Sequence, residues 1–212
     1  MNLGPGNSRI LTLGLDLGQR VDYTALAAIW SEPERDPVTH APWGPWHHTV
    51  VYLERLRQNT EYAAVPEWIR RVLARNSFSG RGTLVVDATG VGAPVVETLR
   101  RAQLGLTVLP VSITAGESVT ASNNGYHVPR LELLTRLAQA IQSQTLRISR
   151  GVGAANSLKE ELSNLRRTLS AGRVRVTTQT HDDLVLATAL AWWWSDRSRK
   201  EMNGRRPLPV GW

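Results

Sequence analysis

Apolar and polar residues alternate along the first quarter of the chain with the period of two that is typical of β-strands. This pattern predicts strands at Ile10–Leu17, Tyr23–Trp30 and His47–Leu56. The segment Glu32–Pro45 holds four prolines and a glycine, which predicts a loop. Short connections favour antiparallel pairing, so we expect a meander of three strands at the start of the domain.

The pattern then changes to alternating helical and strand signals. Apolar residues at helical spacing predict helices at Tyr62–Ala74, Pro94–Ala102, Pro129–Ser143, Ala154–Leu169 and Asp182–Trp194. Short apolar runs predict strands at Thr83–Val86, Leu106–Ile113, Leu146–Ile148 and Val174–Thr177. Thr114–Gly125 is polar and predicts a mobile loop. This order predicts an α/β fold of the RNase H-like kind, in which a mixed central β-sheet (three antiparallel strands, then parallel strands) is flanked by helices.

Length and composition fit a single globular domain. The chain has 212 residues, 42% of them hydrophobic, and no cysteine. No apolar run approaches the roughly 18 residues that span a bilayer, and the N-terminus lacks a signal-peptide pattern, which favours a cytoplasmic location. We expect an N-terminal extension at residues 1–9, the domain at 10–196, and a flexible basic tail at 197–212.

The charge balance favours a polyanionic partner. The formal net charge is +7, and only Lys159 and Lys200 among the 25 basic residues are lysine. Arginine binds phosphate in a bidentate manner and keeps its charge at any working pH. Nucleic acid is the obvious partner, although an arginine-rich codon bias would produce the same composition.

Two aspartates stand where strands end. Asp16 follows an apolar strand that would bury its carboxylate, at a cost unless a cation or a partner compensates it. Asp87 ends the strand Thr83–Val86, at the strand edge where α/β sheets gather ligands. Each aspartate could instead cap a turn or a helix.

A third acidic group, His181–Asp183, opens the last predicted helix. One capping side chain satisfies a helix start, so two adjacent aspartates exceed that need. Successive helix positions point about 100° apart, so Asp182 and Asp183 face different directions, and which one would bind a metal stays open. Oxygen ligands without cysteine suit Mg²⁺ or Mn²⁺, and two such ions can hydrolyse a phosphodiester.

The ordered set of motifs resembles the nuclease domain of phage terminase large subunits, over roughly Ile10 to Ser195. The motifs are Leu13–Asp16, Asp22–Ala25, Val85–Gly92, Val128–Arg130, Leu146–Ile148, Leu158–Leu162, and His181–Asp183 followed by Ala187 and Ala191.

The resemblance implies an RNase H-like endonuclease that cleaves concatemeric double-stranded DNA with two Mg²⁺ or Mn²⁺ ions and little sequence preference. It implies catalytic, metal-binding roles for Asp16, Asp87, Asp183 and Asp182. It also implies three partners: a packaging ATPase domain, a portal and a small terminase subunit. No Gly-Lys precedes Ser or Thr, so the chain has no P-loop and is not a complete packaging motor.

Further residues are candidates for supporting roles. His181 and Asp22 are candidates for orienting the metal ligands, although Asp22 fits a purely structural place in the first hairpin turn. Candidates for DNA contact are His127, Arg130, Arg166, Arg197 and Arg199. Solvated surface arginines would look the same in the sequence.

Three other functions remain open. Holliday-junction resolvases of the RuvC and YqgF kinds share the fold and also use several acids. An actin-like ATPase would use Asp16–Gly18 and Asp87–Gly90 as phosphate loops, but it needs two such domains. A non-catalytic DNA-binding module would gain nothing from a cluster of negative charge.

Overall fold

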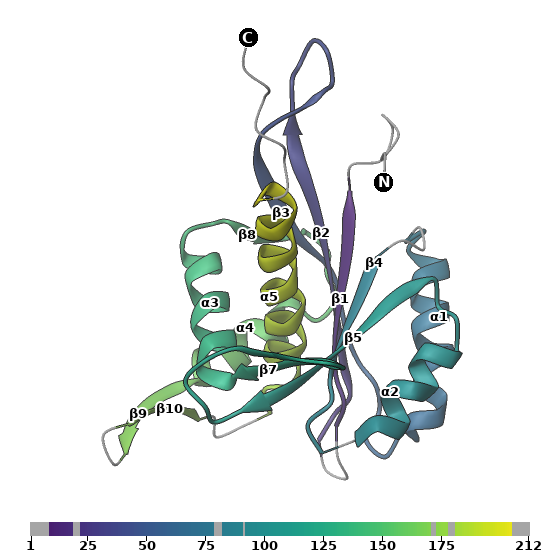
Figure 1. Cartoon of the computed structure of the whole chain (residues 1–212), viewed down its shortest axis with the longest axis vertical. Helices are drawn as coiled ribbons and strands as arrows, with labels where there is room; N and C mark the ends of the chain where they lie inside the picture. The colour runs from purple at the N-terminus through teal and green to yellow at the C-terminus, as the bar shows by residue number, and fades with distance from the viewer. Residues whose placement is uncertain are drawn as a thin grey trace.

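A mixed eight-stranded sheet forms the centre of the molecule, in the order β6-β7-β5-β4-β1-β2-β3-β8 (Figure 1). The computed structural model describes residues 9–18, 22–78, 82–90, 92–170, 173–177 and 181–204. The strands of this sheet are β1 (Ile10–Asp16), β2 (Ala25–Arg35), β3 (Pro42–Arg55), β4 (Gly82–Asp87), β5 (Leu106–Thr114), β6 (Thr120–Ser122), β7 (Gly125–Pro129) and β8 (Leu146–Ile148). β1 to β3 pair in antiparallel fashion, whereas β4 and β5 continue in parallel from β1. The predicted α/β class with a mixed sheet is confirmed.

Helices cover both faces of the sheet (Figure 1). On one face lie α1 (Val65–Arg75), after a short 3-10 turn at Tyr62–Ala64, and α2 (Gly92–Arg101). On the other lie α3 (Arg130–Gln142), α4 (Ala155–Asn164) and α5 (Asp183–Gly204). Strand alternation divides the apolar residues into one core on each side of the sheet. Within the described residues, no helix has the length and apolar character needed to cross a membrane.

Gly14 lets α5 approach the central strand closely. A Cβ atom built on Gly14 would lie 1.9 Å from the carbonyl oxygen of Ala187 and 2.7 Å from the backbone nitrogen of Ala191. Both atoms belong to the helix backbone, so no side-chain rearrangement could make room. The contact brings the start of α5 beside the end of β1, where Asp16 stands.

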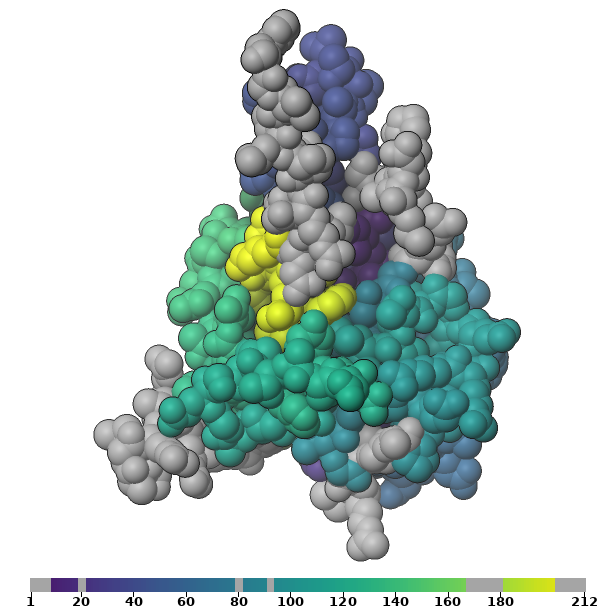
Figure 2. All heavy atoms as spheres, in the orientation of Figure 1, coloured from purple at the N-terminus to yellow at the C-terminus, as the bar shows by residue number. Residues whose placement is uncertain are grey.

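The predicted loop at Glu32–Pro45 is wrong at both ends, because β2 extends to Arg35 and β3 begins at Pro42, and the two strands form a long hairpin arm around a turn at residues 36–41. The arm stands clear of the body in Figures 1 and 2. β1 pairs with β2 only as far as Ser31, so the arm is two-stranded with open edges. Proline lacks an N–H but removes no ladder bond at an open edge, which is why strands tolerate it here.

Four other boundaries differ from the prediction. The predicted loop Thr114–Gly125 contains β6, and the predicted helix Ala154–Leu169 ends at Asn164. A two-stranded hairpin of β9 (Arg166–Ser170) and β10 (Arg173–Thr177) follows it, because those residues pair with each other. α5 extends ten residues past the predicted end, so the flexible tail is wrong for residues 197–204; residues 205–212 lie outside the described part of the chain.

Candidate active site

Asp16 and Asp87 lie side by side at the carboxyl ends of two neighbouring parallel strands. Leu15 of β1 is in register with Val86 of β4, so the two aspartates follow at the same level. Alternation turns both side chains toward α5, since Gly14 and Val85 face that helix. The two carboxylates are close enough for the charge of Asp87 to raise the pKa of Asp16.

Asp16 stands in an environment that disfavours its negative charge. Its side chain is buried, with 7% of the residue exposed. Burial raises the pKa of Asp16 well above its usual value, and the charges of Asp87, Asp183 and Asp182 raise it further, against a smaller opposing effect of Arg130. The acid cluster, which consists of Asp16, Asp87, Asp182 and Asp183, therefore places more negative charge around Asp16 than Arg130 compensates, and a bound cation would relieve this imbalance.

Asp87 has one oriented oxygen. Its Oδ1 accepts the backbone N–H of Thr89 at 2.8 Å, within the turn that links β4 to α2. Burial raises the pKa of Asp87, although the hydrogen bonds from Thr89 and the nearby Arg130 oppose the shift. Thr89 is fixed in turn, because its hydroxyl accepts the N–H of Ile113 at 2.7 Å.

The two adjacent aspartates of α5 have different surroundings. Asp183 is buried, with 4% of the residue exposed, and its charge acts on Asp16 more strongly than that of Asp182. Burial raises the pKa of Asp183 to about 6, although Arg55 opposes the shift. Asp182 instead forms an ion pair with Arg130, the first residue of α3. This difference favours Asp183 over Asp182 as a direct ligand of a divalent metal ion. Asp182 instead holds Arg130 beside the cluster.

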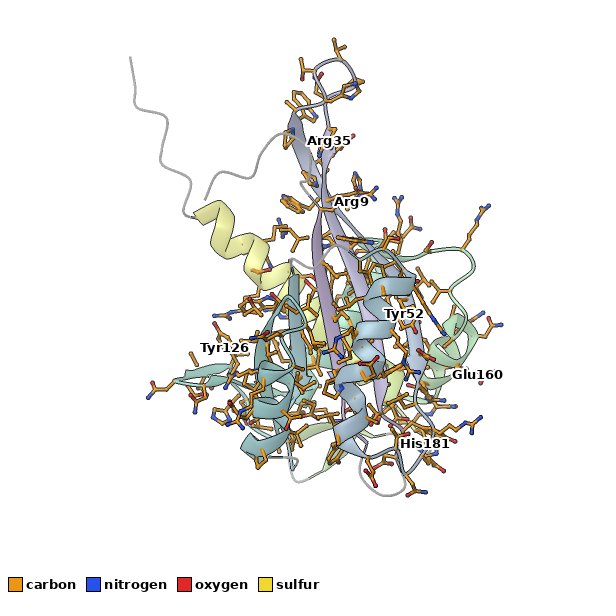
Figure 3. All side chains as sticks on the ribbon, turned by 90° about the vertical axis from the view of Figure 1, so that its right-hand side faces the viewer. Arg9, Arg35, Tyr52, Tyr126, Glu160 and His181 are labelled. Carbon is orange, nitrogen blue, oxygen red and sulfur yellow. The ribbon has the colours of Figure 1, made fainter. Side chains whose placement is uncertain are left out.

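Asp22 and His181 lie closer to the acids than a hairpin-turn role for Asp22 requires. Ligand atoms of Asp22, His181 and Asp183 all fall within 4.8 Å of one another. His181 also packs edge-on against Tyr23, with ring centroids 5.2 Å apart. Figure 3 places His181 at the end of the molecule opposite Arg35 of the arm.

Two further residues lie at the site without a role having been predicted for them, although Glu161 belongs to the quoted motif Leu158–Leu162. Glu161 of α4 is buried and pairs with Arg55, the last residue of β3. The Nε atom of Arg55 lies 3.6 Å from Oδ2 of Asp183. An acid three positions after Leu158, on the face of α4 that packs inward, was the available signal for Glu161. No local pattern marks Arg55, because it lies 106 residues from Glu161 in the chain.

Of the five residues predicted to contact DNA, Arg130 alone is shown beside the acids. His127 alternates with the buried Val128, so its side chain leaves the sheet on the face away from α5. Arg166 bonds the carbonyl oxygen of Ser163 at the base of the β9–β10 hairpin.

Arg197 and Arg199 lie near the far end of α5. Arg197 stacks over the ring of Tyr126 at 4.9 Å, and Arg199 pairs with Asp196 at 3.1 Å. At a helical rise of about 1.5 Å per residue, both lie roughly 20 Å or more along the axis from Asp183. DNA contact by these residues stays a prediction.

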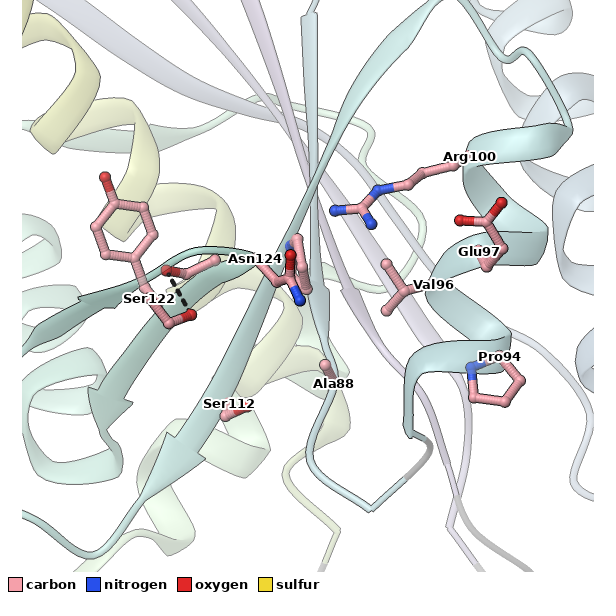
Figure 4. Close-up of a pocket in the computed structure, with 11 residues that line it drawn as sticks. Ala88, Pro94, Val96, Glu97, Arg100, Ser112, Ser122 and Asn124 are labelled. Carbon is pink, nitrogen blue, oxygen red and sulfur yellow. Dashed lines mark hydrogen bonds between the residues drawn. The ribbon is translucent and has the colours of Figure 1, made fainter.

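A pocket of about 570 Å³ lies between α2 and the strands β5, β6 and β7 (Figure 4). Pro110 and Ser112 of β5 line it, whereas Val111 between them packs into the core beneath α5. Arg100 reaches from α2 toward Asn124 across the pocket. The pocket is thus separate from the acid cluster, and the sheet stands between them.

The raised pKa values predict how stability depends on pH without metal. A carboxyl group whose pKa is higher in the folded than in the unfolded state stabilises the fold at low pH, and this stabilisation is lost as pH rises through the folded value. We therefore expect the melting temperature in EDTA to fall between pH 5 and pH 8. Asp16→Asn should raise it at pH 8 and flatten the slope.

Asp36→Asn is the matched control for this measurement. Asp36 caps the turn of the arm, and hydrogen bonds from the backbone of Thr39 and Val38 lower its pKa, so it titrates below this range. Its slope between pH 5 and pH 8 should equal that of the wild type. If Asp16→Asn melts below the wild type at pH 8, the buried charge of Asp16 does not destabilise the fold, contrary to this prediction.

Several solved structures with a similar fold are nuclease domains of terminases. The large terminase nuclease from thermophilic phage G20c matches with a TM-score of 0.55 and 20% identity over 88% of each chain. The human cytomegalovirus terminase nuclease domain matches with a TM-score of 0.58 and 15% identity, over 91% of this chain and 85% of the other. The large terminase nuclease domain of bacteriophage SPP1 matches with a TM-score of 0.53 and 10% identity over 92% of each chain. No protein-family model and no curated protein matches the sequence.

The chain thus has an RNase H-like α/β fold. Its structural neighbours include nuclease domains of terminases, so the fold is the one that the resemblance in the motifs implied.

Proposed function

We propose that the chain is a metal-dependent endonuclease that cleaves concatemeric double-stranded DNA during phage genome packaging. The observation that carries the proposal is the convergence of Asp16, Asp87 and Asp183 from β1, β4 and the start of α5. A net charge of +7 supports a DNA substrate, because positive charge outside the acid cluster attracts the phosphate backbone.

The acid cluster fits hard divalent cations. Its donors are carboxylate oxygens with one imidazole, which suit Mg²⁺ or Mn²⁺. Asp16 and Asp87 would hold one ion, and Asp183 would share in holding a second with His181 and Asp22, whose ligand atoms lie together. Bound ions of this kind supply a nucleophilic hydroxide and stabilise the leaving oxygen. Two neighbouring structures support this choice, since the SPP1 domain has bound Mn and the cytomegalovirus domain was soaked with Mn.

The protein's own residues position the reactants. Thr89 orients Asp87, and the ion pair with Asp182 keeps Arg130 at the rim of the cluster, where its guanidinium can bind a phosphate of the scissile strand. None of these contacts reads a base, so cleavage should show little sequence preference.

The biological setting follows from the same proposal. The chain would act in the cytoplasm of the host cell, together with a packaging ATPase domain, a portal and a small terminase subunit. The role in genome packaging is supported by the structural neighbours, which include nuclease domains of terminases.

Supercoiled plasmid incubated with the protein in Mn²⁺, Mg²⁺ or EDTA tests the proposal. We expect nicked and linear products with a divalent metal, a spread of fragments after long digestion, and intact plasmid in EDTA. Strong preference for a four-way junction over plasmid would favour the resolvase alternative. Intact plasmid under all conditions, together with ATP binding, would overturn the nuclease in favour of an actin-like ATPase.

A further inference from the structure

Glu161 caps α5 from another helix. Its side chain lies on α4 and is buried, with 4% of the residue exposed. Oε2 accepts the backbone N–H of Val185 at 2.9 Å. The first N–H groups of a helix have no partner within the helix, so this bond satisfies one of them. It fixes the first turn of α5, two residues after Asp183.

Arg55 joins Glu161 to the side chain of Asp183. Its guanidinium pairs with Oε1 of Glu161, and its Nε lies 3.6 Å from Oδ2 of Asp183. The same guanidinium lies over the ring of Tyr23, 5.1 Å from the centroid, a cation–π contact that adds to its two carboxylate contacts. Arg55 is the last residue of β3, so it connects the antiparallel part of the sheet to α5.

Burying these charged groups costs more free energy than a purely structural contact would justify. Two carboxylates and one guanidinium are largely removed from water within a few ångströms, and such groups rarely stabilise a fold more than apolar residues of the same size. Both Arg55 Nε and Asp183 Oδ2 are buried without a hydrogen-bond partner among the described residues. The contacts converge on one functional residue, since Glu161 fixes the backbone next to Asp183 and Arg55 lies beside its carboxylate.

We propose that Arg55 and Glu161 are positioning residues that hold the Asp183 carboxylate in its metal-binding orientation. The inference rests on the proposed function, because it assigns to the pair a role at that metal site. Neither residue need contact metal or DNA. Partners that orient a metal ligand typically contribute 10- to 100-fold in metal affinity.

Two substitutions that change the charge in opposite directions distinguish a positioning role of the pair from a purely electrostatic effect on Mn²⁺ binding. Glu161→Gln removes a negative charge near Asp183, whereas Arg55→Met removes a positive one. A purely electrostatic influence would therefore weaken Mn²⁺ binding in the first variant and strengthen it in the second. If the pair positions Asp183, both variants should weaken Mn²⁺ binding by at least about 10-fold.

Titration of the intact chain with Mn²⁺, followed by electron paramagnetic resonance, makes this measurement without requiring cleavage. Glu160→Gln is the matched control, since Glu160 is the exposed neighbour on the same helix and should bind Mn²⁺ like the wild type. Arg55→Lys keeps the positive charge but loses the planar guanidinium that contacts both carboxylates, so it should also weaken Mn²⁺ binding. This conservative variant answers the question if Arg55→Met does not fold, as judged by circular dichroism.

The Mn²⁺ titrations distinguish a failure of the positioning role from a failure of the proposed nuclease function. Weaker Mn²⁺ binding in Glu161→Gln and in the Arg55 variants, with Glu160→Gln unchanged, supports positioning. Tighter binding by Arg55→Met, or wild-type affinity in a folded Glu161→Gln, overturns it. A wild type that binds no Mn²⁺ and does not cleave DNA overturns the proposed nuclease itself.

Discussion

Asp87→Asn is expected to lower the rate of metal-dependent plasmid cleavage by at least about 1,000-fold, a loss of roughly 4 kcal/mol of transition-state stabilisation. Asparagine keeps the shape and can still accept the Thr89 N–H that orients Asp87. It loses the negative charge beside Asp16 and offers a poorer metal ligand. The defect should therefore lie in metal-dependent catalysis and leave folding intact.

The plasmid assay at saturating Mn²⁺ measures this rate, with the melting temperature in EDTA as the test of folding. Glu67→Gln is the control, because Glu67 lies in an exposed ion pair on α1, outside the acid cluster. Its rate should equal that of the wild type. A folded Asp87→Asn variant that cleaves within tenfold of the wild-type rate would remove Asp87 from the active site.

Gly14→Ala is expected to destabilise the protein by about 3 kcal/mol, near the upper end of the usual cost of overpacking a core. The added methyl would lie 1.9 Å from the carbonyl oxygen of Ala187. Only a displacement of α5 away from β1 can relieve this overlap, and that displacement would carry Asp183 away from Asp16. Cleavage should therefore fall even at temperatures where the variant remains folded.

Urea denaturation measures the loss of stability. Gly153→Ala is the matched control, since a Cβ atom there meets nothing within 4 Å, and it should change the free energy of unfolding by less than about 0.5 kcal/mol. Equal stability of Gly14→Ala and Gly153→Ala would show that α5 does not need the close approach at Gly14.

Local patterns predicted most of the strands and helices, because the buried face of each element repeats apolar residues with the period of a strand or a helix. Leu84–Val86 is apolar throughout, since β4 is covered on both faces. The prediction failed where pairing decides the structure. Prolines of the arm occupy open strand edges, and Arg166–Ser170 forms a strand because β10 lies beside it.

The candidate site shows the same division. Asp16, Asp87 and Asp183 could be found from sequence, because a carboxylate at the end of an apolar strand or in excess at a helix start is locally unusual. The sequence left Asp182 and Asp183 open as the metal ligand, and the preference for Asp183 depends on the position of Arg130, which lies 52 residues away from Asp182 along the chain. Arg55 and Glu161 act through contacts between distant segments, so neither residue type alone indicated a role.

The most direct test of the central claim is a crystal structure of the protein soaked in Mn²⁺, with anomalous scattering recorded at the manganese edge. We expect anomalous peaks in contact with Asp16, Asp87 and Asp183 in the wild type. Crystals of Asp87→Asn should show either no peak or a single peak at Asp183. Manganese bound elsewhere, or no peak at these three carboxylates in crystals where the site is open to solvent, would contradict a metal-dependent nuclease centred on them.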